Sequence, residues 1–277
     1  MVPTAMRLFV LVLFVAWPFT GLRADDAPRP PSADESVLFH DAIRKSAQDT
    51  EHWAYTETSS LQASRGEPKG ETIMRFDPSK PYAEQFMPVL IDGKPPTEKQ
   101  LADYRQRGER RGEHVARAAQ AARDPAFVPP PPQLRIGGGN VALDLTHPRV
   151  ARVEAGRVVF EVPVSSPRHD IPVDKLQVLV AVNPVAGLVE NISVHVREAF
   201  RVKLIAKVKA GEMSMDFTVV DPRYGPVPTS LTGDLSGSVL FIPMSGNFTR
   251  TRTEWQRVKS FDERLSVKLG PLQFPDF

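Results

Sequence analysis

The amino-acid sequence predicts an α+β protein: a large, curved antiparallel sheet of roughly ten strands, forming an incomplete barrel, with two main helices covering it. Short segments in which apolar and polar residues alternate, separated by turn residues, predict the strands. Several of these segments have one apolar and one charged face, as antiparallel sheets with one face in water do. Because a flat open sheet of this size is unusual, we expect it to curl.

Residues 1–24 are predicted to be a secretory signal peptide. Arg7 precedes the apolar run 8–22, and Leu22 and Ala24 fit the residues expected just before a cleavage site that follows Ala24. The apolar run is shorter than the roughly 20 residues that span a bilayer, and an uncleaved N-terminal anchor is the alternative. We therefore expect a periplasmic or secreted protein with no transmembrane segment after cleavage.

The composition excludes several classes of protein. The chain has no cysteine, so it has neither a disulfide framework nor a lipid-modified cysteine anchor. Lys and Arg number 35 against 33 Asp and Glu, but residues 1–24 hold Arg7 and Arg23 and no acidic residue. The remaining chain is formally neutral, so we expect no nucleic-acid partner.

Residues 25–33 are predicted to be a disordered leader, because they are rich in proline and lack large apolar residues. A single domain is predicted over 34–277. Its first element is a helix over 34–49, which has acidic residues at its start and basic residues towards its end. The apolar residues of this helix form one stripe: Leu38, Phe39, Ala42 and Ile43.

Three strands are predicted next, over 52–61, 71–77 and 84–92. The third is apolar on both faces and contains Pro88, which lacks an amide hydrogen, so we expect an edge strand or a bulge there. Asp77 and Asp92 end the second and third strands in Asp-Pro and Asp-Gly sequences. Turn formation explains these two carboxylates better than catalysis does.

The second helix is predicted from Thr97, which can form a capping box with Gln100, to about Arg123. Its many charged residues predict a half-exposed helix, and Gly108 and Gly112 in its middle make it a poor apolar lid. Residues 124–139 are rich in proline and glycine, which predicts a long connection.

The second half of the chain is predicted to be almost entirely β-structure. One hairpin joins 176–182 to 192–196 through the turn sequence NPVAG, and a second joins 202–208 to 213–219 through a turn at 210–212. A turn-rich segment follows over 221–238. The final predicted strands are 239–243, 247–258 and 264–269.

Motifs for catalysis and metal binding are absent from the sequence. It contains no GxSxG, no SxxK and no cysteine nucleophile, and its 6 histidines form no HExxH pair. We therefore predict no enzymatic activity, no catalytic residue, no metal site and no cofactor. A dispersed pair of carboxylates leaves no sequence signature, so a hydrolase remains the third hypothesis.

Four stretches carry a resemblance to a known family: the strand with Trp53 and Tyr55, then RFDPSKP (75–81), LIDGKPPT (90–97) and DFTVVDPRYGP (216–226). In these stretches and in its order of elements, the chain resembles bacterial periplasmic proteins of the LolA/LolB-like superfamily of lipoprotein carriers, especially its uncharacterised members. The resemblance implies an incomplete barrel lidded by helices, with an apolar concavity that holds acyl chains. It also implies a carrier or sensor without catalysis.

Two sets of candidate binding residues follow from the predicted strands. Arg250 and Arg252 share one strand face with Glu254, while Trp255 is predicted on the other face. The two arginines are a candidate anion site, and an exposed strand that protects a sheet edge is the alternative. The candidate lining of an apolar cavity is Trp53, Tyr55, Met74, Phe76, Phe86, Leu90, Met213, Met215 and Phe217.

The sequence thus favours an exported, non-catalytic envelope protein that binds a lipid or other apolar ligand in the concave face of a half-barrel. The alternative is a periplasmic protein-interaction or structural module with a filled core and an envelope protein as its partner. The identity of the ligand and the oligomeric state have no signature in the sequence.

Overall fold

The structure is a computed structural model. It describes residues 27–47, 52–63, 70–121, 123, 135–136, 141–154, 156–166, 172–202, 206–239 and 242–265. The predicted signal peptide (1–24), most of the predicted connection (124–139) and the end of the last predicted strand (266–269) lie outside the described residues.

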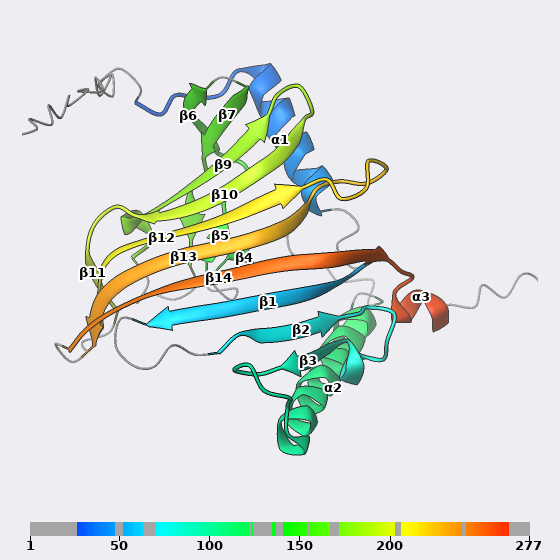
Figure 1. The fold of residues 1–277 in the computed structure, drawn as a ribbon. Coiled ribbons are helices and arrows are strands. Elements are labelled where there is room, and N and C mark those ends of the chain that lie inside the picture. The colour runs from blue at the N-terminus through cyan, green and yellow to red at the C-terminus, as the bar shows by residue number, and fades with distance from the viewer. Residues whose placement is uncertain are drawn as a thin grey trace, which may run out of the picture.

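The body of the protein is one antiparallel sheet of 11 strands (Figure 1). Its strands lie in the order β3, β2, β1, β14, β13, β12, β10, β9, β7, β6, and β11 pairs with β12. The strands β1 and β14, far apart in the sequence, pair in the middle of the sheet. The bounds are β1 (Trp53–Ala63), β2 (Thr72–Phe76), β3 (Phe86–Leu90), β6 (Arg149–Glu154), β7 (Arg157–Glu161), β9 (Leu176–Asn183), β10 (Leu188–Val196), β11 (Phe200–Val202), β12 (Ala206–Thr218), β13 (Val227–Val239) and β14 (Ile242–Arg257).

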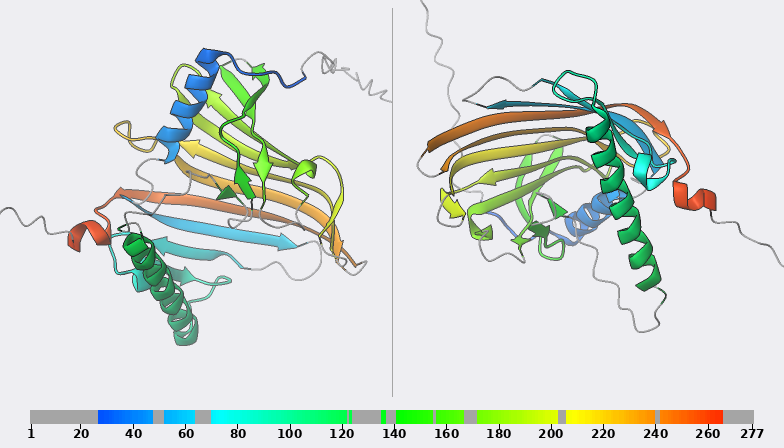
Figure 2. Two further views of the ribbon diagram at one scale, coloured as in Figure 1. Left: turned by 180° about the vertical axis from the view of Figure 1, so that it is seen from behind. Right: turned by 90° about the horizontal axis from the view of Figure 1, so that it is seen from below.

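The main sheet is curved and not closed, since β3 and β6 form its two ends. Figure 2 shows it arched over the helix α1 (Ala33–Ala47) and over a second sheet of 3 strands. The small sheet consists of β4 (Arg135–Ile136), β5 (Val141–Leu143) and β8 (Val164–Ser165). The predicted α+β class, with a large curved antiparallel sheet that stops short of a barrel, is confirmed.

The hydrophobic core lies between α1 and the concave face of the sheet, where α1 packs on β9 and β10. Phe39 and Ala42, from the predicted apolar stripe, are completely buried, and the Phe39 ring lies 4.9 Å from the ring of Phe160. β-Branched residues fill most of the sheet side of this core. The buried residues are Phe39, Ala42, Leu143, Val150, Val158, Phe160, Val162, Val178, Val180, Val182, Val189 and Ile192.

Residues 27–33, in the predicted disordered leader, are held by two sets of contacts instead. The backbone of Arg29 pairs with that of Val150 on the edge strand β6, with N–O distances of 3.0 and 2.8 Å. Ser32 and Glu35 form a capping box at the start of α1. The Arg29 guanidinium and the Ser32 amide lower the pKa of Glu35 to about 2. The proline content of the segment gives no sign of these contacts, because the backbone of Arg29 pairs with the open edge of a strand that is distant in the sequence.

The second long helix, α2 (Glu98–Ala121), starts with the predicted capping box. The amide of Thr97 donates to Gln100 Oε1 (2.8 Å), and the amide of Gln100 donates to Thr97 Oγ1 (3.3 Å). The helix packs on η2 (Tyr82–Glu84) and β3, at the edge of the main sheet. A Cβ at Gly108 would lie 2.2 Å from the carbonyl oxygen of Tyr82. The backbone of α2 therefore packs directly against the backbone of η2 at this position, with no side chain between them.

Strand β3 has both features that Pro88 predicted. It is an edge strand of the main sheet, and its register with β2 shifts. Pro88 lies opposite Met74 while Leu90 lies opposite Ile73, which leaves Val89 as the extra, bulged residue.

Asp77 and Asp92 form turns, as predicted. Asp77 Oδ1 accepts hydrogen bonds from the amide (3.0 Å) and hydroxyl (2.7 Å) of Ser79. Asp92 and Gly93 have φ values of 50° and 73°, the left-handed backbone that an Asp-Gly turn requires. Both carboxylates are therefore accounted for by local backbone structure.

The hairpin of β9 and β10 is confirmed, and it follows a short helix η3 (Val173–Lys175). The second predicted hairpin is wrong: Gly211 lies inside β12, which pairs with β13 on both sides of it. A Cβ at Gly211 would lie 2.8 Å from Leu235 Cδ1, so the glycine makes room for a neighbouring side chain. The start of β12 pairs instead with β11.

The segment predicted to be turn-rich, 221–238, contributes most of strand β13. Gly233 in this strand lies opposite Phe248, and a Cβ at Gly233 would lie 2.1 Å from the Phe248 ring. The ring therefore covers the glycine and replaces the contacts of a side chain there. The predicted strand 264–269 is also wrong at its start, which belongs to helix α3 (Phe261–Leu265).

Candidate functional site

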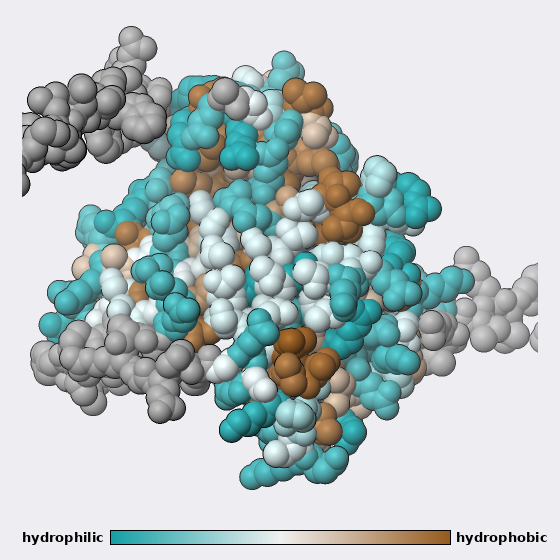
Figure 3. Space-filling view, in the orientation of Figure 1, coloured by the Kyte–Doolittle hydropathy of each residue, from teal (hydrophilic) through white to brown (hydrophobic). Residues whose placement is uncertain are grey.

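The two faces of the main sheet have different chemistry. Opposed residues of antiparallel strands share a face, so the strand register assigns each side chain. On the convex face, Thr253, Thr251 and Thr249 of β14 lie opposite Thr56, Thr58 and Ser60 of β1. Figure 3, which views this face, shows a pale, uncharged band across the middle of the sheet. The convex face carries apolar side chains towards the two ends of the sheet, at Val159, Leu179 and Ala181 and at Ile73 and Leu90, whereas the concave face carries them on one strand after another.

Apolar side chains continue along the concave face from strand to strand. Pairs of opposed residues mark the path: Phe86 and Phe76, Phe76 and Tyr55, Leu231 and Met215, Met215 and Ile192, Ile192 and Val180, Val180 and Phe160. Under α1 this face is closed, and Val180 and Phe160 are 0% exposed. Further along, Met215 and Leu231 are only half-buried. The apolar face thus extends beyond the part that α1 covers.

Four aromatic rings cluster on the concave face beyond α1. The Tyr55 ring lies 4.8 Å from that of Trp255 and 5.0 Å from that of Phe76, and the Trp53 ring lies 6.1 Å from that of Trp255. These are the separations of rings in direct contact. The Trp255 indole also donates a hydrogen bond to the carbonyl of Arg252 (3.1 Å). The cluster is therefore held in one arrangement by its own contacts.

The cluster lines a pocket of about 290 Å³, here called the aromatic pocket. Its lining residues are Trp53, Tyr55, Phe76, Val227, Pro228, Arg252 and Trp255. They come from β1, β2, β13 and β14, whose pairing fixes their positions. Trp53 and Val227 are almost fully buried, while the other five are half-buried.

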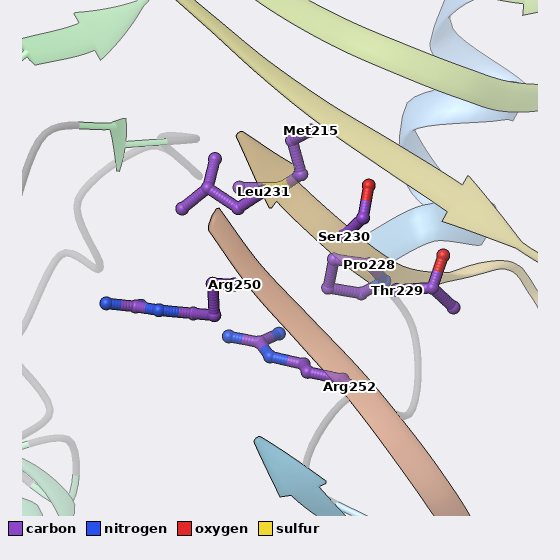
Figure 4. A pocket seen from close by; sticks show the side chains of 7 residues that line it. All are labelled: Met215, Pro228, Thr229, Ser230, Leu231, Arg250 and Arg252. Carbon is purple, nitrogen blue, oxygen red and sulfur yellow. The ribbon is translucent and has the colours of Figure 1, made fainter. Parts of the chain in front are cut away.

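Beside the aromatic pocket lies an ionic cluster of one carboxylate and two guanidiniums. Glu57 is 5% exposed. Its Oε2 accepts a hydrogen bond from Arg252 Nε (2.9 Å), and its Oε1 lies 3.3 Å from Arg250 Nε. Figure 4 shows Arg250 and Arg252 extending from the same side of β14, next to Met215 and Leu231.

Arg252 connects the ionic cluster to the aromatic pocket. Its guanidinium carbon lies 4.7 Å from the centre of the Tyr55 ring, a cation–π contact. Burial raises the pKa of the Tyr55 hydroxyl, and the charge of Arg252 opposes part of that rise. Tyr55 is therefore a neutral hydrogen-bonding group at neutral pH.

The structure brings most of the predicted cavity residues to one face. Trp53, Tyr55 and Phe76 line the aromatic pocket, and Arg250 and Arg252 lie beside it. Leu90 does not join them, because the bulge at Val89 places it with Ile73 on the convex face. The remaining predicted residues share the concave face outside the aromatic pocket: Met74, Phe86, Met213, Met215 and Phe217.

Three pocket residues were missed by the sequence prediction: Val227, Pro228 and Trp255. Strict alternation placed Trp255 on the face of the threonines. In the structure, Glu254 has a φ of 53° and the register between β1 and β14 shifts, so Trp255 joins the concave face. A bulge of this kind has no reliable sequence signal. Val227 and Pro228 were hidden in the segment predicted to be turn-rich.

Among the residues that the structure describes, no group of three His, Asp or Glu side chains is placed to hold a metal ion. In the same part of the chain, no helix has the length and apolar character needed to cross a membrane. The titratable groups that line the aromatic pocket are Tyr55 and Arg252. The pocket therefore offers apolar surface, one hydroxyl and one positive charge.

No protein-family model matches the chain, and no curated protein matches its sequence. Among solved structures, the chain is similar to a LolA superfamily protein from Nitrosomonas europaea, with 10% sequence identity and a TM-score of 0.35. The match covers 84% of this chain and 96% of that one. At this identity and TM-score, the function has to be argued from the chain's own side chains.

Proposed function

We propose that this protein is an exported, non-catalytic envelope protein that binds a lipid or other apolar ligand on the concave face of its half-barrel. The observation that carries the proposal is the aromatic pocket, which lies on the part of the apolar face that α1 leaves uncovered. Concave sites lined by aromatic side chains, with a few polar groups, are typical of small-molecule binding sites.

The energetics of the concave face favour an apolar occupant. Met215, Leu231 and Phe76 are half-buried, whereas Val180 and Phe160 on the same face are completely buried under α1. Each 100 Å² of apolar surface that a ligand removes from water contributes about 2–3 kcal/mol before the costs of binding. A bound ligand would thus bury the apolar side chains at this end of the sheet, as α1 buries those at the other end.

The pocket is also suited to binding without reorganisation. Its side chains lie on paired strands, and Trp255 is held by a backbone hydrogen bond and by the rings of Trp53 and Tyr55. Side chains that already occupy their bound positions lose little conformational entropy when a ligand arrives.

The chemistry of the lining supports binding rather than catalysis. A guanidinium stays protonated and cannot act as a base. Burial raises the pKa of the other titratable group, the Tyr55 hydroxyl, so this group does not lose its proton easily to form a phenolate that could act as a base. Glu57 lies next to the pocket, but its two oxygens face Arg250 and Arg252.

Uptake of the neutral dye N-phenylnaphthylamine tests the proposal. We expect a saturable rise in dye fluorescence with the wild-type protein. Replacing Phe76 with alanine removes one wall of the aromatic pocket, so it should weaken dye binding roughly three- to tenfold. The matched control is Phe200→Ala, the same change at a half-buried phenylalanine on β11, outside the pocket lining. It should leave the affinity unchanged within about twofold.

Two results would contradict this location of the site. A wild-type protein that takes up no dye has no accessible apolar pocket of this kind. Equal losses of dye affinity in Phe76→Ala and Phe200→Ala would show that the dye does not sit against Phe76.

Export is the second part of the proposal, and it is supported by the apolar run and cleavage sequence within 1–24. We expect the protein recovered from the envelope fraction of a bacterial host that expresses the full chain to begin at Asp25. Intact-mass measurement and N-terminal sequencing check this. Protein that retains Met1 and stays in the cytoplasmic fraction would overturn it.

A protein-interaction role is the second candidate, and the convex face at the sheet edge favours it. Ile73 and Leu90 lie opposite each other there, and Val89 is 52% exposed. Figure 3 shows a brown, apolar patch over β2 and β3. An apolar patch beside an open strand edge is a common feature of protein-binding surfaces. Crosslinking from Val89→Cys, with the dye assay run in parallel, separates this role from ligand binding.

A further inference from the structure

We infer that the ligand of the concave face is an anionic amphiphile, whose single negative headgroup binds Arg250 and Arg252 while its apolar part lies in the aromatic pocket. This inference rests on the proposed function and names the chemical class of its ligand. The headgroup chemistry is that of a carboxylate or a phosphodiester, which share a negative charge spread over two oxygens.

The local charge is unbalanced. Arg250 and Arg252 face one carboxylate, that of Glu57, so one positive charge remains. Neither the lining of the aromatic pocket nor that of the hollow in Figure 4 includes another acidic residue. A headgroup with one negative charge would make the cluster neutral.

The hydrogen-bonding groups of the two arginines are also incompletely used. Arg252 donates to Glu57 through Nε, and Arg250 approaches Glu57 through Nε as well. Within the described part of the chain, the terminal nitrogens of both guanidiniums make no hydrogen bond, whereas the Nε of Arg250 is buried 3.3 Å from Glu57 Oε1. Arginine donors arranged in this way suit the paired oxygens of a carboxylate or phosphate.

The position of the arginines fits a ligand with a charged head and an apolar tail. Arg252 lines both the aromatic pocket and the hollow that Arg250 shares with Met215 and Leu231. Its stacking on Tyr55 and its bond to buried Glu57 hold it at that junction. A headgroup at the arginines would therefore place the first part of its tail against the aromatic rings.

The test compares ligands that share one tail and differ in the head. Laurate and dodecanol are titrated as competitors of N-phenylnaphthylamine on the purified protein, and the two affinities are compared. We expect laurate to bind about tenfold more tightly than dodecanol, because charge-assisted hydrogen bonds form only with the carboxylate. Raising the salt concentration should weaken laurate binding alone. Lysophosphatidylglycerol against lysophosphatidylcholine repeats the comparison for a phosphodiester and shows which of the two anion sources is preferred.

Two single variants shift the local charge in opposite directions. Arg250→Gln keeps the 2.9 Å bond between Arg252 and Glu57 and removes the excess positive charge, so the laurate preference should fall to about twofold or less. Glu57→Gln raises the excess charge and should strengthen laurate binding. Dodecanol affinity should change little in Arg250→Gln.

The outcomes separate this inference from the proposed function. Equal affinities for laurate and dodecanol in the wild-type protein would overturn the anionic class of the ligand. A laurate preference that survives in Arg250→Gln would overturn the placement of the headgroup at the two arginines. Both results would leave apolar binding intact. A protein that binds neither the dye nor dodecanol would overturn both. Where Glu57→Gln fails to fold, Arg250→Gln still decides the question, because its remaining ion pair is complete.

Discussion

Replacing Phe39 with alanine should lower the free energy of unfolding by about 3–5 kcal/mol. The ring is 0% exposed and lies against Phe160 between α1 and the sheet. Its removal leaves a cavity that paired strands cannot collapse to fill, so the transfer and cavity costs add. Urea unfolding followed by circular dichroism measures the effect.

Val37→Ala is the control for this prediction, since Val37 lies on the same helix but is 62% exposed. Its effect should stay within about 0.5 kcal/mol. Similar losses at the two positions would mean that α1 does not pack on the sheet through the Phe39 stripe.

Replacing Gly108 with alanine should loosen or undock α2 and cost about 1–3 kcal/mol. In an exposed helix this change is stabilising, by roughly 0.5–1 kcal/mol. Here the new Cβ would lie 2.2 Å from the Tyr82 carbonyl oxygen and 2.7 Å from Ala83 Cα, and backbone atoms cannot turn away. Hydrogen exchange over 82–85 and 98–121, together with the melting temperature, reports the change.

Gly112→Ala is the matched control on the same helix. The three atoms nearest to its Cβ would all belong to the Tyr82 side chain, at 3.0–3.1 Å, and a side chain can shift by a few tenths of an ångström more easily than the backbone atoms that face Gly108. We expect a small change in the free energy of unfolding, of either sign. A Gly108→Ala protein that is as stable as wild type, with unchanged exchange in α2, would refute the close docking of the helix on η2.

The sequence was a good guide wherever local chemistry decides the structure. The capping box at Thr97, the Asp92-Gly93 turn and the proline that marks β3 as a bulged edge strand all depend on residues close together in the chain. The alternation in β1, β2 and β12 likewise assigned the right side chains to the concave face, because the period of a strand is local.

Sequence prediction failed where the environment of a residue comes from distant strands. Gly211 and Gly233 appeared to be turn residues, but Leu235 and Phe248 on neighbouring strands fill the space that they leave. The defined conformation of residues 27–33 depends on backbone pairing with Val150, which lies on an edge strand more than a hundred residues away in the sequence. None of these partners is visible in a local window.

By itself, the sequence determined the class of the fold, the absence of cysteine chemistry, and most of the side chains that face the concavity, including Trp53, Tyr55, Arg250 and Arg252. The tertiary structure decided which of them form a site. The pairing of β1 with β14 brought Glu57 under the two arginines. The bulge at Glu254 then directed the Trp255 side chain towards the aromatic pocket, because one extra residue in a strand moves the side chains that follow it to the opposite face.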